Sequence, residues 1–469
     1  MANHRQIAEE IVFVAAKRGV DFADVRIVEE SSTRVMVEDG KADRASSQSE
    51  VGAGIRVLVN GAWGFVSADT TSRRRLLVAL DEAIELAKSS APRVTDPAAV
   101  AEVKPVTATF RTRFVRDPRE VGAADKVAAV KSYESAACKH GGAAIVNSQV
   151  SYSDAMIGEV IANTRGTLVE QHSTTTYLSC RVAAVKDGMR QTGSERKGII
   201  GGYELVDGTT CEDFSIVAVD RALTLLSAKP APGGTFPVIF DPSATGLFTH
   251  EALGHNAEAD AVWTGQSILA GKMGEKIAAD CVTIIDDPTL EGKFGYYLYD
   301  SEGTPARRRV IVENGVFKEM LHSLETARRF GATPNGAARA EGHTARPIVR
   351  MSNTFIEPGK GSFEAMLKSI DKGIYLRDAQ GGYVFPERGL FTCKAGQAMM
   401  IEHGQLGEPL RDVSVGGLTL EILKTIEMVG SDFEVAWPGF CGKGGQSVPT
   451  AIGGPHLKVS QIVVGGRAE

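Results

Sequence analysis

The sequence lacks the features that mark secreted, membrane-spanning and nucleic-acid-binding proteins. Its first residues include Glu9 and Glu10, where a signal peptide would be apolar. No later segment approaches the roughly 18 consecutive apolar residues that cross a bilayer. The formal net charge is −6, and basic and acidic residues are mixed along the chain, so neither nucleic acid nor a membrane is an expected partner. We therefore predict a cytoplasmic protein.

Cysteine is also scarce. Six cysteines are spread over 469 residues with no short paired spacing, which argues against a disulfide framework. A single cysteine is more often a small buried hydrophobe than a ligand. Cys281 and Cys393 lie in apolar strand patterns, and we expect both in the core.

The chain does contain enough apolar sequence for more than one core. Hydrophobic residues make up 43% and charged residues 23%, as in ordinary globular proteins. At 469 residues, two or three domains are expected. The proline- and glycine-rich stretch 229–234 is the clearest boundary. It predicts an N-terminal domain over residues 1–228 and a C-terminal domain over residues 235–469.

Helical and strand patterns alternate before this boundary, and strand patterns dominate after it. Asp39-Gly40 and Asn60-Gly61 are strong hairpin signals, and Asp117-Pro118-Arg119-Glu120 is typical of a helix start. The predicted fold class is α+β. We expect an N-terminal α/β domain with a mainly antiparallel sheet, followed by a mainly antiparallel β domain that carries the helix described next.

The stretch from Phe248 to Asp260 concentrates more titratable side chains than any other segment. His250 and His255 are five residues apart, which places their rings roughly 140° apart on a regular helix. One π-helical turn would absorb the extra residue and bring both rings to one side, and Gly254 lowers the cost of that distortion. The predicted cap of this helix is Ser243. Two ordinary helix histidines would give the same pattern without a metal.

A second stretch of this kind lies near the C-terminus. Cys441 is flanked by glycine and by Lys443, an environment that suits a thiolate either as a metal ligand or as a nucleophile. Two imidazoles and one thiolate make three protein ligands and leave the open tetrahedral position that a catalytic zinc requires. His456 is close in sequence, but we expect it to be a hydrogen-bonded histidine at the start of a strand.

These residues carry a resemblance to a known family. The motif His250-Glu251-x-x-x-His255 is followed by Glu258 and Asp260. The motif Cys441-Gly442-Lys443-x-Gly445-Gln446 comes about 190 residues later, and Asp300-Ser301-Glu302-Gly303-Thr304-Pro305 lies between the two. In this order the motifs resemble the TldD/PmbA family of metallopeptidases. The likeness spans nearly the whole chain and is most specific in the C-terminal half.

The resemblance implies a cytoplasmic, zinc-dependent peptidase that cleaves unfolded or extended peptides inside a chamber formed by a dimer. It implies one zinc ion per metal-bearing subunit, with His250, His255 and Cys441 as ligands and Glu251 as general base. The partner subunit is a second copy or a related metal-free chain, and this sequence resembles the metal-bearing type. Glu258 and Asp260 are close enough in sequence to orient the imidazoles, although acids that only stabilise the helix would look the same.

Two other functional classes fit the same residues. The first is a non-catalytic structural or peptide-binding subunit of the same architecture, which would lack bound metal and would lose nothing when Glu251 becomes Gln. The second is a metal-dependent hydrolase of a non-peptide amide, which only substrate assays distinguish from a peptidase.

Overall fold

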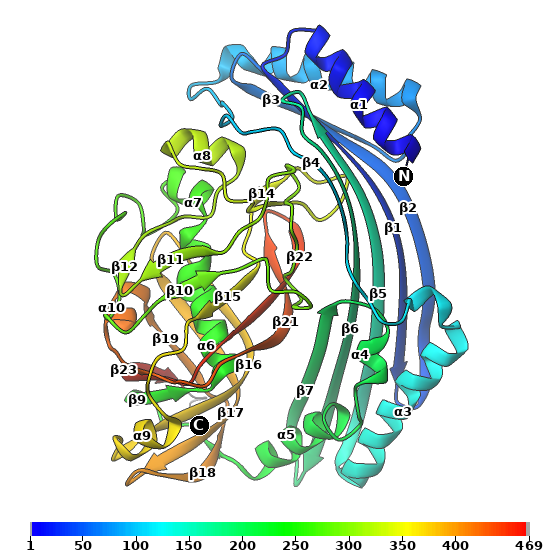
Figure 1. The fold of residues 1–469 in the computed structure, drawn as a ribbon. Helices are drawn as coiled ribbons and strands as arrows, with labels where there is room; N and C mark the ends of the chain where they lie inside the picture. Colours follow the sequence, from blue (N-terminus) through cyan, green and yellow to red (C-terminus); the bar gives the residue numbers. More distant parts are fainter. Residues whose placement is uncertain (1, 466–469) are drawn as a thin grey trace.

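The computed structural model describes residues 2–465 as a mixed α/β protein, which confirms the predicted mixture of helix and sheet. The strands of these residues form a seven-stranded sheet in the N-terminal half and six- and eight-stranded sheets in the C-terminal half, with one further two-stranded pair. Figure 1 shows the long N-terminal strands as an arc with the C-terminal elements on its concave side. Within residues 2–465, no helix is long and apolar enough to cross a membrane.

The N-terminal sheet has the strand order β3-β2-β1-β5-β6-β4, with β7 paired to β6. Both predicted hairpin turns are confirmed, and Asp39-Gly40 and Asn60-Gly61 have the positive φ angles that a type I′ turn requires. The strands are longer than predicted, because the ladder of β1 continues through polar residues 29–32, where the apolar alternation stops. The strands are β1 (Phe22–Glu38), β2 (Lys41–Val59), β3 (Ala62–Ala68), β4 (Thr107–Arg111), β5 (Ile145–Asn163), β6 (Leu168–Lys186) and β7 (Met189–Ile200).

Helices pack on this sheet towards its two ends (Figure 1). Leu76, Leu80 and Ile84 of α2 are buried at helical spacing, as the sequence pattern predicts. Asp117 caps a helical turn, as predicted, but this turn is a short 3-10 helix over 118–120, and the predicted continuous helix is wrong because α3 begins only after the extended residues Val121 and Gly122. The helices are α1 (Ala2–Lys17), α2 (Arg73–Ser90), α3 (Ala123–Gly141), α4 (Glu204–Asp207) and α5 (Ser215–Ser227).

The C-terminal half is organised around one short helix, α6 (Pro242–Thr249), which contacts strands of both large C-terminal sheets. Gly246 makes this possible, since a Cβ atom there would lie 2.2 Å from the Gly453 nitrogen. The first sheet has the order β12-β11-β10-β15-β22-β21. Its strands are β10 (Ile284–Asp286), β11 (Arg309–Glu313), β12 (Val316–Phe317), β15 (Asn353–Ile356), β21 (Glu434–Lys443) and β22 (Gln446–Gly454).

The second C-terminal sheet has the order β16-β9-β23-β19-β17-β18-β8, with β20 paired to β23. Its strands are β8 (Lys229–Pro230), β9 (Gly234–Phe240), β16 (Lys372–Phe385), β17 (Leu390–Glu402), β18 (Gln405–Arg411), β19 (Ser414–Leu418), β20 (Ile426–Val429) and β23 (Leu457–Gly465). The remaining elements are the pair β13 (Ala338–Arg339) and β14 (Ile348–Val349) and the helices α7 (Ala259–Trp263), α8 (Leu324–Phe330), α9 (Phe363–Lys368) and α10 (Thr419–Lys424).

A buried ion-pair network joins the N-terminal sheet to the C-terminal half. The Arg56 guanidinium on β2 donates to Asp24 on β1 and, at 2.8 Å, to Glu302 of the C-terminal half. Arg26 donates to Glu159 of the same sheet and to the carbonyls of Gly342 and Ala345. These two guanidinium groups donate hydrogen bonds to carboxylates and carbonyls from both halves. The two parts are therefore connected by buried polar contacts as well as by the chain.

Candidate metal centre

The helix that carries the predicted site begins at a strong cap. The Asp241 carboxylate accepts a hydrogen bond from the Ala244 N–H at 2.7 Å, and Pro242 occupies the first helical position. Ser243, the predicted cap, lies inside the helix and donates to Asp241 instead. The prediction was wrong because the aspartate two residues earlier already accepts from the free N–H of Ala244. Asp241 follows β9 directly, so the sheet fixes where the helix starts.

The predicted π-helical turn is confirmed. After α6 the chain forms a π-helical turn over residues 250–254, in which the His255 N–H donates to the carbonyl of His250, five residues earlier. A short 3-10 turn over 255–257 follows. The extra residue brings the two imidazoles together, with ring centroids 5.1 Å apart. A regular helix would have separated them.

The structure brings Cys441 to the same point from β21. Its Sγ lies 3.4 Å from Nε2 of His255, and one ligand atom each of His250, His255 and Cys441 lies within 4.8 Å of the other two. Two ligands of one tetrahedral zinc are about 3.5 Å apart, given zinc bonds of about 2.0–2.3 Å. His250 and Cys441 are buried, and His255 is largely so. The cluster therefore has the donor types and spacing of a metal centre.

Charge within the cluster favours the metal-binding form of the thiol. Burial alone would raise the pKa of Cys441, but the adjacent imidazoles of His250 and His255 outweigh that effect and lower the pKa to about 4. A thiolate, rather than a thiol, is the form that binds a metal. The buried Nδ1 of His250 has no hydrogen-bond partner among the described residues.

Glu258 and Asp260 lie behind the cluster. Glu258 is buried and accepts from Nδ1 of His255 at 3.1 Å, which leaves Nε2 facing Cys441. Lys443 donates to both carboxylate oxygens of Asp260, at 2.7 and 2.8 Å, and its Nζ is 3.1 Å from Glu258. Burial would raise the pKa of Glu258, but the charges of Lys443 and His255 lower it to about 2. Asp260 thus acts on the cluster only through Lys443.

Glu251 lines a cavity of about 870 Å³ that also exposes His250, His255 and Cys441. Residues of β16 and β21 also line this cavity. Gly382 on β16 is pressed against Glu251, because a Cβ atom there would lie 2.6 Å from Glu251 Cγ. The backbone of β16 at Gly382 therefore limits where the Glu251 side chain can lie.

Two supporting residues escape prediction from the sequence. Arg350 is fully buried and donates to the carbonyls of Cys441 and Gln446, which holds the thiol-bearing strand in place. Gly382 contacts Glu251, although 131 residues separate the two in the sequence. The only sequence signal was the pair Gly381-Gly382 inside a strand pattern, which often marks a bulge or a close approach. A bulge between Ala379 and Gly381 is present.

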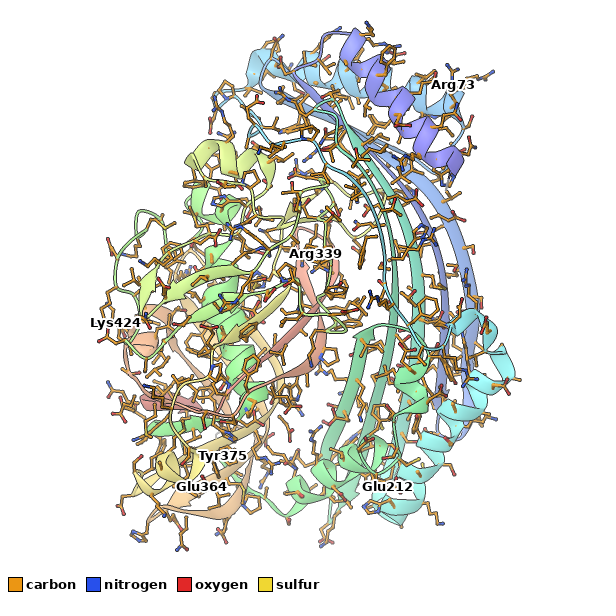
Figure 2. The ribbon with its side chains drawn as sticks, viewed as in Figure 1. Arg73, Glu212, Arg339, Glu364, Tyr375 and Lys424 are labelled. Atoms are coloured by element: carbon orange, nitrogen blue, oxygen red, sulfur yellow. The ribbon has the colours of Figure 1, made fainter. Side chains whose placement is uncertain are left out.

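A second arginine, which is half-buried, lies near Arg350. Figure 2 labels Arg339 where the C-terminal half faces the N-terminal sheet. It donates to the carbonyl of Met351 at 2.8 Å and lies over the Tyr297 ring. Burial lowers its pKa to about 10.

The other predicted residues lie apart from the cluster. His456 interacts with the Tyr375 hydroxyl at 2.9 Å and with Asp432 at 2.7 Å, so the prediction of a hydrogen-bonded histidine is confirmed. Cys393 is buried, as predicted. The prediction for Cys281 was wrong: it is exposed, because it lies in a turn before β10 rather than in a strand.

Family profiles match almost the whole chain. A profile described as PmbA/TldA metallopeptidase domain 1 matches residues 23–91, the central domain of the same family matches 116–226, and its C-terminal domain matches 233–466. The C-terminal match contains His250, Glu251, His255 and Cys441.

Individual proteins agree with the profiles. A metalloprotease of Methanothermobacter thermautotrophicus is 40% identical over 95% of this chain and 96% of its own length. A zinc metalloprotease TldD homolog of Saccharolobus solfataricus is 34% identical over 52% of this chain and 55% of its own. The crystal structure of TldE from Thermococcus kodakarensis superposes with a TM-score of 0.78 over 98% of this chain and all of that chain, at 21% identity, which shows the shared fold.

Proposed function

The chain belongs to the PmbA/TldD family of metallopeptidases, and from this premise we propose that it is a zinc-dependent peptidase that hydrolyses unfolded peptides. The observation that carries the proposal is the convergence of two imidazoles from one helix with a thiolate that lies 186 residues beyond His255. The names of the relatives support metalloprotease activity, and one relative is named a zinc enzyme.

The donor set fits zinc. His250, His255 and Cys441 offer two nitrogens and one sulfur, which suits zinc and not magnesium or calcium, whose ligands are oxygens. Three protein ligands also leave one position free for substrate or water. A zinc ion held there supplies a Lewis acid that polarises a carbonyl and makes water more acidic.

The remaining steps belong to side chains of this chain. Glu251 takes the proton of the attacking water and passes it to the leaving amine, and its place beside His250 on the cavity wall suits that role. Glu258 fixes the tautomer and the orientation of His255. Lys443 neutralises Glu258 and Asp260, so that two buried carboxylates do not repel each other.

We propose that the substrate is an extended peptide. In the described residues β21 pairs only with β22, so the backbone groups of its other edge join no strand ladder, and its residues 437–443 line the cavity. A peptide that adds to such an edge is bound through its backbone, which favours broad sequence tolerance. Peptides cleaved with strong dependence on sequence would contradict this recognition mode.

The assembly and location are also proposals. We propose two domains, over residues 1–228 and 235–469, which is supported by the separation of the sheets into two groups; residues 1 and 466–469 lie outside the described part. Dimerisation with a second copy or a related metal-free subunit, around an enclosed chamber in the cytoplasm, is supported by the family resemblance. A non-catalytic subunit is not favoured, because the cluster of His250, His255 and Cys441 is complete.

Metal analysis combined with one substitution tests the function. We expect about one zinc per chain, and loss of cleavage of an unfolded peptide on chelation that zinc restores. Glu251→Gln should lower kcat by about 100-fold or more with zinc retained. Glu387→Gln, which removes a carboxylate from the same cavity, is the matched control and should change kcat little. Full activity of the Glu251→Gln protein would refute the proposed mechanism.

A further inference from the structure

Arg196 reaches the metal-site cavity from the other half of the molecule. It lies on β7, which in the described residues pairs only with β6 and so forms an edge of the N-terminal sheet. β7 packs closely on β21: a Cβ atom at Gly198 would lie 3.0 Å from Cβ of Pro438. Arg196 is half-buried and lines the same cavity as Glu251 and Cys441. The N-terminal sheet thus contributes a cation to a site otherwise built by the C-terminal half.

This cation has no anionic partner within residues 2–465. The nearby acids Glu195 and Asp378 are both bound by Arg221, at 2.6 and 2.5 Å. The Arg196 guanidinium donates to the carbonyl of Gln380 at 3.4 Å, and within residues 2–465 it forms no ion pair; only the backbone N–H of Arg196 reaches a carboxylate, that of Glu195 at 2.9 Å. A guanidinium has five N–H donors, so most of its hydrogen-bonding capacity is left for a ligand.

The other charged residues that line the cavity do not pair with the Arg196 guanidinium. Glu258 is paired with Lys443 and His255. Glu251 and Glu387 line the cavity, but neither is within ion-pair distance of the Arg196 guanidinium. The wall formed by β7 therefore presents a positive charge to whatever occupies the cavity.

We propose that Arg196 binds a carboxylate of the peptide substrate, either the C-terminal carboxylate or an acidic side chain. The inference rests on the proposed peptidase function and adds a preference to it. The planar guanidinium matches a carboxylate through two parallel N–H···O bonds, which fix direction as well as charge. A carboxylate held on β7 while the chain crosses to the metal cluster sets which peptide bond lies beside Glu251.

Peptide binding tests this without turnover. The zinc-loaded Glu251→Gln protein is titrated by fluorescence polarisation with four labelled peptides of one sequence. One has a free C-terminus and no acidic residue, and the second is its C-terminal amide. The third and fourth are amides that carry either one internal Glu or the matching Gln. In this background we expect one carboxylate-bearing peptide to bind at least about tenfold more tightly than its neutral match.

Substitutions test whether Arg196 causes that preference. Adding Arg196→Gln should abolish the difference within the preferred pair and leave the affinity of the neutral peptides unchanged, and Arg196→Lys should restore part of it. Arg190→Gln, an exposed arginine on the same strand, is the matched control and should leave the preference intact. Preference in the first pair identifies the chain terminus, and preference in the second identifies an acidic side chain.

Two results would overturn the inference. One is equal affinity within both pairs before Arg196 is changed, and the other is a preference that survives Arg196→Gln. The proposed function fails separately, if the zinc-loaded protein with Glu251 intact cleaves none of the four peptides although a carboxylate preference in binding is present.

Discussion

At Gly382 the strand β16 comes into contact with the carboxylate proposed as general base. A methyl group there would lie 2.6 Å from Glu251 Cγ and 3.2 Å from its Cδ, so the Glu251 side chain must move. We expect Gly382→Ala to lower kcat by about 10- to 100-fold, because small misplacements of a catalytic group are costly, while zinc content stays unchanged. Gly381→Ala is the matched control, since nothing lies within 4 Å of a Cβ atom there. Equal kcat values for the two variants would show that Glu251 is not held by β16.

His322 lies in the core away from the metal cluster and links stability to pH. Burial lowers its pKa from 6.5 to about 4. Between these values the unfolded chain binds a proton that the folded protein does not, so the free energy of unfolding falls as the pH drops from 6.5 to 4, by up to about 3 kcal/mol. Urea unfolding of the metal-free protein at pH 7 and pH 5 should show this loss. His322→Gln should reduce it, whereas His403→Gln, which changes an exposed histidine, should not.

The residues predicted from sequence share one property: each belongs to a short local motif. The spacing of His250 and His255 and the glycines around Cys441 are visible within a dozen residues. No such motif marks Arg350, Gly382 or Arg196. Each of them acts on a residue far away in the sequence, and the residues next to it show no pattern that would predict this.

The π-helical turn is the element that converts a five-residue spacing into a shared site. Gly254 lies within it, and a Cβ atom there would lie 2.0 Å from Sδ of the buried Met351. We expect Gly254→Ala to lower the free energy of unfolding by about 1–3 kcal/mol through overpacking. Zinc affinity should fall as well, because the turn must shift. Both effects are measurable by chemical unfolding and by competition with a chelator.

A second substitution tests whether the conflict with Met351 causes this loss. Met351→Ala removes the group that the new methyl would meet, so the double variant should be more stable than the sum of the two single effects predicts. Strict additivity would mean that contact with Met351 is not the cause of the loss.

The elements themselves were predictable where the signal is local. The Asp39-Gly40 and Asn60-Gly61 turns and the α2 core face follow from residue type and spacing. The length of β1 was not predictable, because cross-strand pairing on both sides, with β2 and β5, carries the ladder through polar residues. α6 begins at Asp241 because this residue comes before Ser243 after β9. The sequence alone could not decide between the two, because Asp and Ser are about equally favoured as N-caps.

At the scale of the whole molecule, the proposed active site depends on how the two halves fit together. The turns that follow α6 and the strand β21 supply the metal cluster, β16 limits the position of the base, and β7 of the N-terminal sheet adds Arg196 to the cavity lining. Movement of the N-terminal half relative to the C-terminal half would leave the metal cluster intact but would move β7 away from the cavity. The contacts that prevent movement are therefore expected to affect peptide binding more than zinc binding.

Arg56 makes one of these contacts, since it is buried between Asp24 of the N-terminal sheet and Glu302 of the C-terminal half. Arg56→Met would leave two buried carboxylates without a cation, and we expect it to cost about 3–5 kcal/mol of unfolding free energy. Hydrogen exchange should rise along β1, β2 and residues 300–304, with zinc content retained and peptide affinity reduced. Arg73→Met, which breaks an exposed ion pair with Glu10, is the control and should change the free energy of unfolding by no more than about 1 kcal/mol. If peptide affinity is unchanged in Arg56→Met while exchange rises across the junction, the N-terminal wall takes no part in substrate binding.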